Sequence, residues 1–283
     1  MSTSEFQIDF VKMTGAGNDF VLIDNRTHFL QLYWKIYAPK FCDRRYGVGA
    51  DGLIIIEQDT TAPFAMNYYN ADGSYGGMCG NGGRCAALYM MDQEKVDEIY
   101  FHALDHVYYA TRSYADSLQL SMKDPRCIRT NLIIDIHDSQ LPIHFIDTGA
   151  PHAVFFVDDL PQSMQEYLNS NGINEIGRQV RFSGLFAPAG ANVNFVSVLD
   201  NQGISLRTYE RGVEDETLAC GTGSVASALL SALVRGLRSP IVVHTRSKEN
   251  LRVTFQLEGE RLSDVKLEGP ARIVFRGKFV LQV

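Results

Sequence analysis

Two segments of the chain share one pattern, a Cys-Gly-x-Gly turn that leads into a run of small and apolar residues. They begin at Cys79 and at Cys220, about half the chain apart. Because neither run presents a charged face, each predicts a helix that is buried in a core. A weaker echo pairs residues 15–24 with residues 149–158, each a turn followed by an apolar strand that ends in Asp. These repeats predict an internal duplication, with two related halves.

Short strand-like runs fill much of the remaining sequence. Many alternate polar and apolar residues, and short polar or glycine turns join several of them, which is typical of a largely antiparallel sheet. The expected fold class is α+β, with few helices, one of them at residues 161–168. The strand-like runs lie at residues 20–23, 53–56, 65–69, 107–110, 132–136, 154–157, 193–198, 205–209, 241–244, 251–255 and 272–275.

The length of the chain and one polar stretch indicate where the halves meet. A chain of 283 residues suits two domains, each with a core of its own. The stretch Asp124-Pro125-Arg126 is polar, contains proline and separates two strand-like runs. We therefore expect one domain to span residues 1–125 and the other residues 126–270.

Composition excludes several classes of protein. The formal net charge of −7, and the lack of a run of basic residues, disfavour binding to nucleic-acid phosphates. No apolar run is long enough to span a membrane, and residues 1–6 lack the pattern of a secretory signal. We expect a cytoplasmic protein with a small-molecule substrate, whose five cysteines are free thiols because that compartment is reducing.

The chemistry of a cysteine at a helix start explains why the repeated turn matters. Backbone N–H groups and the helix dipole favour the thiolate there, which lowers the pKa of the thiol from about 8.5 towards neutrality. The glycines let the same N–H groups approach an anion such as a carboxylate. Two such groups on opposite faces of one carbon can remove a proton and return one, which inverts the stereocentre. Cys79 and Cys220 are the expected acid–base pair.

Other uses of the cysteines and glycines fit the sequence less well. Free cysteine is often a packing residue, and Cys42, Cys85 and Cys127 are assigned to that use. The spacing of Cys79 and Cys85 does not match a zinc-binding pair, so we expect no metal site. A dinucleotide fingerprint and a phosphate-binding loop are both lacking, so we expect no cofactor.

An ordered series of motifs resembles the diaminopimelate epimerase family over nearly the whole chain. The matching motifs are Lys12-Met13-Thr14-Gly15-Ala16-Gly17-Asn18-Asp19-Phe20, Asp43-Arg44-Arg45-Tyr46-Gly47-Val48-Gly49-Ala50-Asp51-Gly52, Asn70-Ala71-Asp72-Gly73-Ser74, Met78-Cys79-Gly80-Asn81-Gly82-Gly83-Arg84-Cys85, Pro151-His152-Ala153-Val154, Asn192-Val193-Asn194-Phe195, Glu210-Arg211-Gly212 and Glu216-Thr217-Leu218-Ala219-Cys220-Gly221-Thr222-Gly223. Matches in this number and order are very specific.

The resemblance implies an isomerase that interconverts LL- and meso-diaminopimelate without a cofactor, for lysine and peptidoglycan precursor biosynthesis. It implies two pseudo-symmetric domains, each a curved sheet around a central helix, with the active site in the cleft between them. The last strand, residues 271–283, would return to the first domain. Family members often form homodimers, and their catalytic thiols fall on Cys79 and Cys220.

The resemblance also assigns further site residues. The guanidinium of Arg211 would bind a substrate carboxylate in a bidentate manner, through two parallel hydrogen bonds. His152 and Glu210 match the polar groups that orient the thiols or tune their protonation. The implied substrate contacts are Asn18, Asn70, Gly80, Asn81, Asn192, Glu210, Arg211, Gly221 and Thr222.

Three positions depart from the commonest family pattern. Ala150 stands where many members have Asn, and Gly52 stands where many have Gln. The segment from Arg211 to Glu216 is one residue longer than usual. These departures concern the distal end of the substrate more than the reacting centre.

Three other functions remain compatible with the residues themselves. A racemase of another amino acid would share the thiols but would not need Asn70, Asn192 and Arg211 for a second charged end. A thiol–disulfide protein would use Cys79 and Cys220 as a redox pair. A non-catalytic binding protein would bind its ligand without turnover, and it would be excluded if replacing each cysteine separately by Ala left binding intact but abolished turnover.

Overall fold

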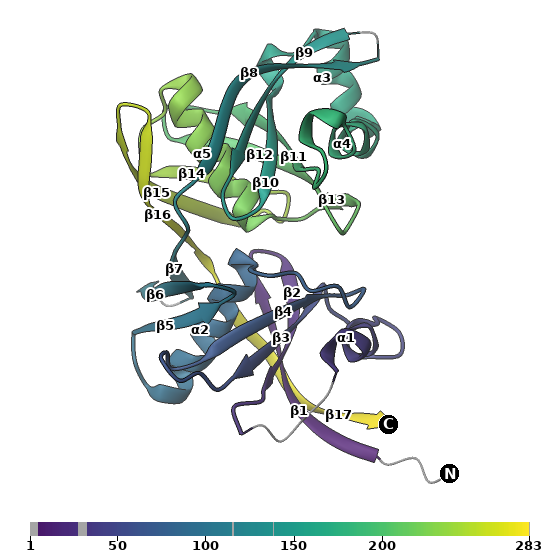
Figure 1. Ribbon diagram of the computed structural model, residues 1–283, viewed down its shortest axis with the longest axis vertical. Helices are drawn as coiled ribbons and strands as arrows, with labels where there is room; N and C mark the ends of the chain where they lie inside the picture. Colours follow the sequence, from purple (N-terminus) through teal and green to yellow (C-terminus); the bar gives the residue numbers. More distant parts are fainter. Residues whose placement is uncertain (1–4, 28–32, 115, 138, 283) are drawn as a thin grey trace. The chain divides into compact units, whose positions relative to one another are not determined.

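The computed structural model describes residues 5–27, 33–114, 116–137 and 139–282. The chain divides into two compact units, of which unit 1 comprises Met1–Leu120 and Gly269–Val283, and unit 2 comprises Ser121–Glu268 (Figure 1). Each unit combines a mixed, mostly antiparallel set of strands with a few helices. The α+β class predicted from the sequence is confirmed.

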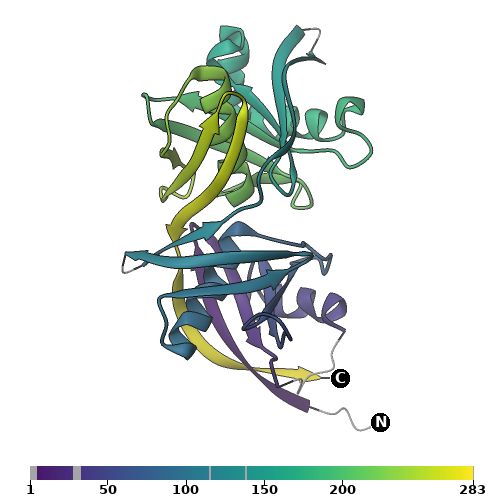
Figure 2. The same ribbon diagram turned by 60° about the vertical axis from the view of Figure 1, so that its left-hand side comes forward.

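Unit 1 is built on a run of paired strands that includes both the first and the last strand of the chain. Figures 1 and 2 show β17 alongside β1, with which it pairs antiparallel. The pairing then passes from β1 through β2, β3, β4, β5 and β6 to β7. The strands are β1 (Glu5–Gly15), β2 (Asn18–Asp24), β3 (Gly52–Glu57), β4 (Ala65–Asn70), β5 (Glu98–Ala103), β6 (His106–Tyr114), β7 (Ser117–Ser121) and β17 (Arg272–Gln282).

Unit 2 is built in the same way. Its pairing passes from β8 through β9, β10, β11, β12, β14 and β15 to β16, and β13 forms a short hairpin with β12. The strands are β8 (Arg126–Ile136), β9 (Ser139–Asp147), β10 (Pro151–Phe156), β11 (Asn192–Val198), β12 (Gly203–Glu210), β13 (Asp215–Thr217), β14 (Ile241–His244), β15 (Asn250–Glu258) and β16 (Arg261–Pro270).

The order of parallel and antiparallel pairs is the same in the two units. In unit 1, β2–β3 and β4–β5 are parallel, whereas β1–β2, β3–β4 and β5–β6 are antiparallel. In unit 2, β10–β11 and β12–β14 are parallel, whereas β9–β10, β11–β12 and β14–β15 are antiparallel. Strand pairing therefore repeats the internal duplication that the two cysteine turns predict.

One long helix lies at the centre of each unit. Helix α2 (Gly80–Glu94) packs against β1, β2, β3, β4, β5 and β17, and helix α5 (Gly221–Arg235) packs against β9, β10, β11, β12, β14 and β15. Both have 15 residues, are mostly buried and end on a left-handed residue, Lys95 or Gly236. The prediction of two buried helices after the glycine turns is confirmed.

The smaller helices complete each core. Trp34, Phe41 and Cys42 of α1 are buried against β3 in unit 1. In unit 2, α3, predicted at residues 161–168, packs with α4 into a hydrophobic core. These helices are α1 (Trp34–Cys42), η1 (Val157–Asp159), α3 (Gln162–Tyr167), η2 (Leu168–Gly172), α4 (Ile173–Arg181) and η3 (Gly184–Phe186).

The predicted strand-like runs all lie on strands, except that Val157 begins η1. Sequence patterns missed β1, β5, β7, β9, β13 and β16, and the helices α1 and α4. Strand β16 shows why: it includes Ser263, Asp264, Lys266 and Glu268 between its buried apolar residues, and so resembles a polar loop.

Candidate functional site

Cys79 is the residue immediately before helix α2. Its backbone is extended (φ −111°, ψ 119°), and its thiol accepts the N–H of Gly82 at 3.4 Å. Its carbonyl accepts the N–H of Gly83 at 2.7 Å, which closes the first helical turn. The half-buried sulfur thus occupies the capping position where helices usually carry Ser or Asp. Helix N–H groups stabilise a negative charge at this position.

Cys220 occupies the same position before α5. Its backbone angles are φ −115° and ψ 115°, and its thiol accepts the N–H of Gly223 at 3.3 Å. The hydroxyl of Thr222 lies 3.6 Å from the sulfur, and Ser224 donates to the Cys220 carbonyl at 2.8 Å. The local geometry of Cys79 therefore recurs at a second thiol, which is buried.

The other cysteines differ in their surroundings. Burial raises the pKa of Cys42 and of Cys85 to about 12, so both stay protonated at neutral pH, as expected of packing residues. The packing assignment is wrong for Cys127, which is exposed. It lies in β8 with φ 53°, where the register against β9 shifts and turns the side chain away from the core. All five cysteines are free thiols, as predicted.

In unit 1, an amide network joins the start of α2 to the β1–β2 hairpin. The Asn81 amide donates to Asn18 Oδ1 at 2.6 Å, and Arg84 donates to Asn81 Oδ1 at 2.7 Å. Arg84 is fully buried and also donates to the Gly80 carbonyl at 3.3 Å. Asn18, Gly80 and Asn81, all predicted substrate contacts, are therefore held together on one buried framework.

A cluster of charges fixes the other side of Asn18. Its amide donates to Asp51 at 3.0 Å, and Arg44 bridges Asp51 and Asp19, each at 2.8 Å. Lys12 also donates to Asp19, at 2.7 Å. Burial alone would raise the pKa of Asp19, but the hydrogen bonds from Arg44 and Lys12 lower it to about 2. This cluster fixes the hairpin through hydrogen bonds to both aspartates.

Asn70, another predicted substrate contact in unit 1, is the last residue of β4. Its amide donates to Ser74 Oγ at 2.9 Å, and its backbone N–H donates to the Ser74 carbonyl at 2.9 Å. Gly52 pairs with Asn70 across β3 and β4, and the ring of Tyr68 occupies the space where a side chain at Gly52 would lie. This packing explains how the chain accommodates glycine at the position where many family members carry Gln.

In unit 2, His152 is fully buried beside Asn192 in the β10–β11 register. Its Nδ1 lies 3.1 Å from the amide nitrogen of Asn194. Burial, reinforced by the positive charge of Arg211, lowers the pKa of His152 to about 3. The imidazole is neutral at physiological pH.

Asn192 and Arg211 are linked through the backbone. Asn192 Oδ1 accepts the Arg211 N–H at 2.8 Å, and its amide donates to the Pro151 carbonyl at 3.3 Å. The Arg211 guanidinium donates to the Ala189 carbonyl at 3.4 Å and, within the described residues, forms no ion pair with a carboxylate. Burial and the nearby Arg181 lower the pKa of Arg211. Such a half-buried cation suits an anionic ligand.

The longer segment between Arg211 and Glu216 forms a tight turn. Glu214 adopts φ 58° and accepts hydrogen bonds from Tyr209 (3.2 Å), Gly212 (3.0 Å) and Arg181 (3.2 Å). Glu210, at the end of β12, pairs in register with Asp215. The extra residue is absorbed by this turn, which keeps Glu210 and Arg211 at the end of the strand.

Glu216 anchors the segment that leads to Cys220. It accepts hydrogen bonds from Arg207 at 2.6 and 2.8 Å and lies 3.1 Å from Arg246. At the other side of the helix start, Thr148 donates to the Thr222 carbonyl at 3.1 Å. Gly221 and Thr222 therefore begin α5 between two fixed loops.

The structure brings the predicted site residues together in two groups. Unit 1 holds Asn18, Asn70, Cys79, Gly80 and Asn81 around the start of α2. Unit 2 holds the remaining predicted residues around the start of α5: His152, Asn192, Glu210, Arg211, Cys220, Gly221 and Thr222.

Several supporting residues were not predicted: Arg84, Lys12, Asp19, Arg44, Asp51, Asn194 and Thr208, whose hydroxyl donates to Asn194 Oδ1 at 3.0 Å. The motif Asn192-Val193-Asn194 contained a usable signal, because alternate residues of a strand share one face. The two asparagines therefore had to lie on the same side of β11. The charge cluster had no such signal, since its two parts, residues 12–19 and residues 44–51, lie in separate segments of the sequence.

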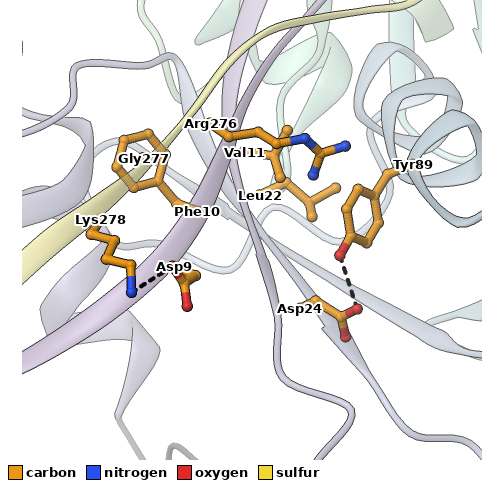
Figure 3. Close-up of a pocket in the computed structure, with 9 residues that line it drawn as sticks. All are labelled: Asp9, Phe10, Val11, Leu22, Asp24, Tyr89, Arg276, Gly277 and Lys278. Carbon is orange, nitrogen blue, oxygen red and sulfur yellow. Dashed lines mark hydrogen bonds and ion pairs between the residues drawn. The ribbon is translucent and has the colours of Figure 1, made fainter. Parts of the chain in front are cut away.

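A separate cavity of about 440 Å³ lies in unit 1 away from these residues (Figure 3). In it, Tyr89 donates to Asp24 at 3.1 Å, and Lys278 lies 3.6 Å from Asp9. No predicted site residue lines it. The lining residues are Asp9, Phe10, Val11, Leu22, Asp24, Tyr89, Arg276, Gly277 and Lys278.

Comparison with solved structures supports the fold. The chain is similar to a probable proline racemase from Agrobacterium radiobacter, with a TM-score of 0.71 and 14% identity, covering 97% of this chain and 93% of that one. It is also similar to a hydroxyproline epimerase from Agrobacterium vitis, with a TM-score of 0.70 and 14% identity, covering 98% and 93%. At this identity the likeness establishes a shared fold.

Sequence comparison establishes the family. The diaminopimelate epimerase family model matches residues 10–105 and 144–274. A diaminopimelate epimerase from Chlorobaculum tepidum is 42% identical over 273 residues, covering 95% of this chain and all of that protein. Another, from Flavobacterium psychrophilum, is 39% identical over 265 residues, covering 93% and 97%. The resemblance found in the motifs is confirmed, and the chain belongs to the diaminopimelate epimerase family.

Proposed function

We propose that this chain is an isomerase that interconverts LL- and meso-diaminopimelate, with Cys79 and Cys220 as the acid–base pair. The observation that carries the proposal is the repeated thiol geometry: each sulfur caps a buried 15-residue helix and accepts the N–H of a glycine, at 3.4 Å and 3.3 Å. General acid–base catalysis requires two groups whose pKa values lie near the working pH, and a helix N-terminus brings a thiol into that range.

The chemistry assigns a distinct task to each thiol in each direction. One thiolate removes the proton from the α-carbon of the substrate, and the other, protonated, thiol delivers a proton to the opposite face. The carbanion that forms is stabilised through its carboxylate by the helix N-termini at Gly80, Asn81, Gly221 and Thr222. After turnover the two thiols have exchanged protonation states, so the enzyme is ready for the reverse isomer.

The remaining polar residues suit a substrate with two charged ends. Arg211 is a half-buried guanidinium able to bind a carboxylate through two parallel hydrogen bonds. We assign Asn18, Asn70, Asn192 and Glu210 to the other polar groups of the amino acid. We assign His152 and Glu210 to orienting the reacting groups.

A substrate panel tests the proposal. The protein is incubated with LL-diaminopimelate, and the meso isomer is separated by chiral chromatography. Proline, hydroxyproline and glutamate, offered in parallel, are expected to give no inversion because they lack a second amino-acid centre. Inversion of one of these, without inversion of diaminopimelate, would assign the chain to a different racemase activity.

We also propose that the enzyme acts in the cytoplasm as a homodimer and supplies lysine and peptidoglycan precursors. Helices of the described residues include none long and apolar enough to cross a membrane. Apolar side chains are exposed along β1 and β17, where Phe6 is 41%, Val274 57% and Val280 49% exposed, and these could be covered by a second copy. Sedimentation of the purified protein would give a dimer mass, whereas a monomer mass would refute this part.

A further inference from the structure

Asn194 is a fully buried amide whose polar atoms are all in use. Its Nδ2 lies 3.1 Å from the Ala153 carbonyl and 3.1 Å from His152 Nδ1. Its Oδ1 accepts the hydroxyl of Thr208 at 3.0 Å. The side chain is 0% exposed, so each of these contacts replaces a hydrogen bond to water.

These contacts fix the orientation of the amide. If Asn194 were flipped, its carbonyl oxygen would face the carbonyl oxygen of Ala153, and two acceptors would meet in a buried place. In the orientation seen, the Nδ2 atom has two hydrogens and two acceptors. Because Nδ2 can only donate, His152 Nδ1 must accept and cannot carry a proton.

The proton of neutral His152 therefore lies on Nε2. Within the described residues this atom is buried and has no hydrogen-bond partner. Leaving a buried donor without an acceptor destabilises the folded protein. Burial, together with the positive charge of Arg211, disfavours a second proton on the ring. The ring is thus held with one donor directed away from Asn194.

We propose that Asn194, anchored by Thr208, is a positioning residue that holds neutral His152 as the Nε2–H tautomer. His152 then serves the epimerisation as a hydrogen-bond donor to a thiolate or to the substrate, and does not serve as a proton-accepting base. This assignment rests on the proposed function, because it gives His152 a task in that reaction. The tautomer itself can be measured without any activity.

The internal duplication shows that the pairing of a buried Asn with His is found in unit 2 and has no counterpart at the matching positions of unit 1. In the aligned echo Asn18 matches His152 and Phe20 matches Val154. Val154 pairs with Asn194, whereas Phe20 pairs with Gly52. The position that matches Asn194 therefore has no side chain in unit 1, and Asn18 is held by Asn81 and Asp51 instead.

Nitrogen-15 NMR of histidine-labelled protein tests the tautomer. The His152 signals are identified as those lost in His152→Gln. At pH 7 we expect a proton-bearing Nε2 and an unprotonated Nδ1. In Asn194→Asp the carboxylate becomes the acceptor, so we expect the proton to move to Nδ1 or the ring to become charged. A wild-type ring protonated on Nδ1, or charged at pH 7, would overturn the proposal.

Kinetics test the role. Gln at position 152 can offer an amide donor but no basic nitrogen, so His152→Gln should retain at least about 10-fold more kcat than His152→Ala if the ring acts as a donor. Equal losses in the two variants would overturn the donor role. Thr208→Val should lower kcat with little change in KM, and Thr208→Ser, which keeps the hydroxyl, should restore it. Equal loss in Thr208→Ser would overturn the anchoring role of the hydroxyl.

The NMR and kinetic experiments distinguish a failure of the proposed function from a failure of the role assigned to Asn194. A chain without epimerase activity whose His152 is still the Nε2–H tautomer would refute the proposed function and leave the tautomer assignment intact. An active epimerase with the opposite tautomer would refute the role of Asn194 alone. Because NMR reports directly on folding, a variant that fails to fold is recognised, and the Thr208 pair then decides the anchoring step.

Discussion

The amide oxygen of Asn194 lies 2.6 Å from the place that a Cβ atom on Gly223 would occupy. The same Cβ would lie 3.2 Å from the Cys220 sulfur. Glycine is therefore required three residues after the cysteine, because its N–H must approach the thiol while Asn194 packs against its Cα. This contact connects the helix start that presents Cys220 to the residue that holds His152.

We expect Gly223→Ala to displace Asn194 and weaken the cap of α5. Overpacking at such a site costs about 1–3 kcal/mol of unfolding free energy, and activity should fall with it. Gly184 is the control, since a Cβ there meets nothing within 4 Å and its φ is not left-handed. Urea unfolding and initial rates measure both variants. Equal effects of Gly184→Ala and Gly223→Ala would show that the packing against Asn194 is unimportant.

Each proposed catalytic thiol should be essential on its own. Cys79→Ser and Cys220→Ser should each lower kcat by about 10²- to 10⁴-fold, the usual contribution of a general acid or base. Binding of diaminopimelate, measured by calorimetry, should persist. Cys127→Ser, on the exposed thiol, should leave kcat unchanged. Substantial turnover by either single variant would contradict the two-thiol mechanism.

Arg211 should govern recognition of a substrate carboxylate. Losing a hydrogen bond to a charged group costs about 1.5–3 kcal/mol, so Arg211→Met should reduce kcat/KM by about 10- to 100-fold. Arg211→Lys should recover only part of this, because an ammonium cannot form two parallel hydrogen bonds. Arg238, which is exposed, is the matched control, and Arg238→Met should have no effect. Unaltered kinetics in Arg211→Met would remove it from the site.

His152 should make the fold sensitive to acid. Burial lowers its pKa to about 3 from 6.5, so between these values the unfolded chain binds more protons than the folded chain. Stability contributed by this group is therefore present above pH 6.5 and is lost as the pH falls, by at most about 2 kcal/mol at pH 5. Urea unfolding at pH 7 and pH 5 should show this loss in the wild type and less of it in His152→Gln. His144, whose pKa burial also lowers, contributes equally to both proteins. The same pH dependence in both would place the acid sensitivity elsewhere.

Local patterns were enough to predict eleven of the strands and the two central helices. A strand such as residues 53–56 is continuously apolar, and the helices after Cys79 and Cys220 are rich in Ala and Leu. The duplication could be predicted because each half of the sequence contains one Cys-Gly-x-Gly turn. Helix α1 was missed because Pro39 interrupts its pattern, although its buried face holds Trp34 and Phe41.

The supporting residues could not be predicted from local patterns. Arg84 lies in an apolar helix, and only the fold shows that Asn81 and the Gly80 carbonyl accept its hydrogen bonds. Lys12 and Asp51 meet through Asp19 and Arg44 because β2 and β3 are parallel neighbours. The prediction that Cys127 is a packing residue was wrong because its exposure depends on a local shift of register in β8.

Labelling in D₂O tests the two-thiol mechanism most directly. LL-diaminopimelate is incubated with the enzyme in D₂O, and both isomers are analysed by mass spectrometry early in the reaction. Because one thiol removes the proton and the other delivers a solvent deuteron, the meso product should carry one deuterium at the inverted α-carbon while the remaining LL substrate stays unlabelled. Meso product that retains the original hydrogen, or the appearance of no meso product, would contradict the mechanism.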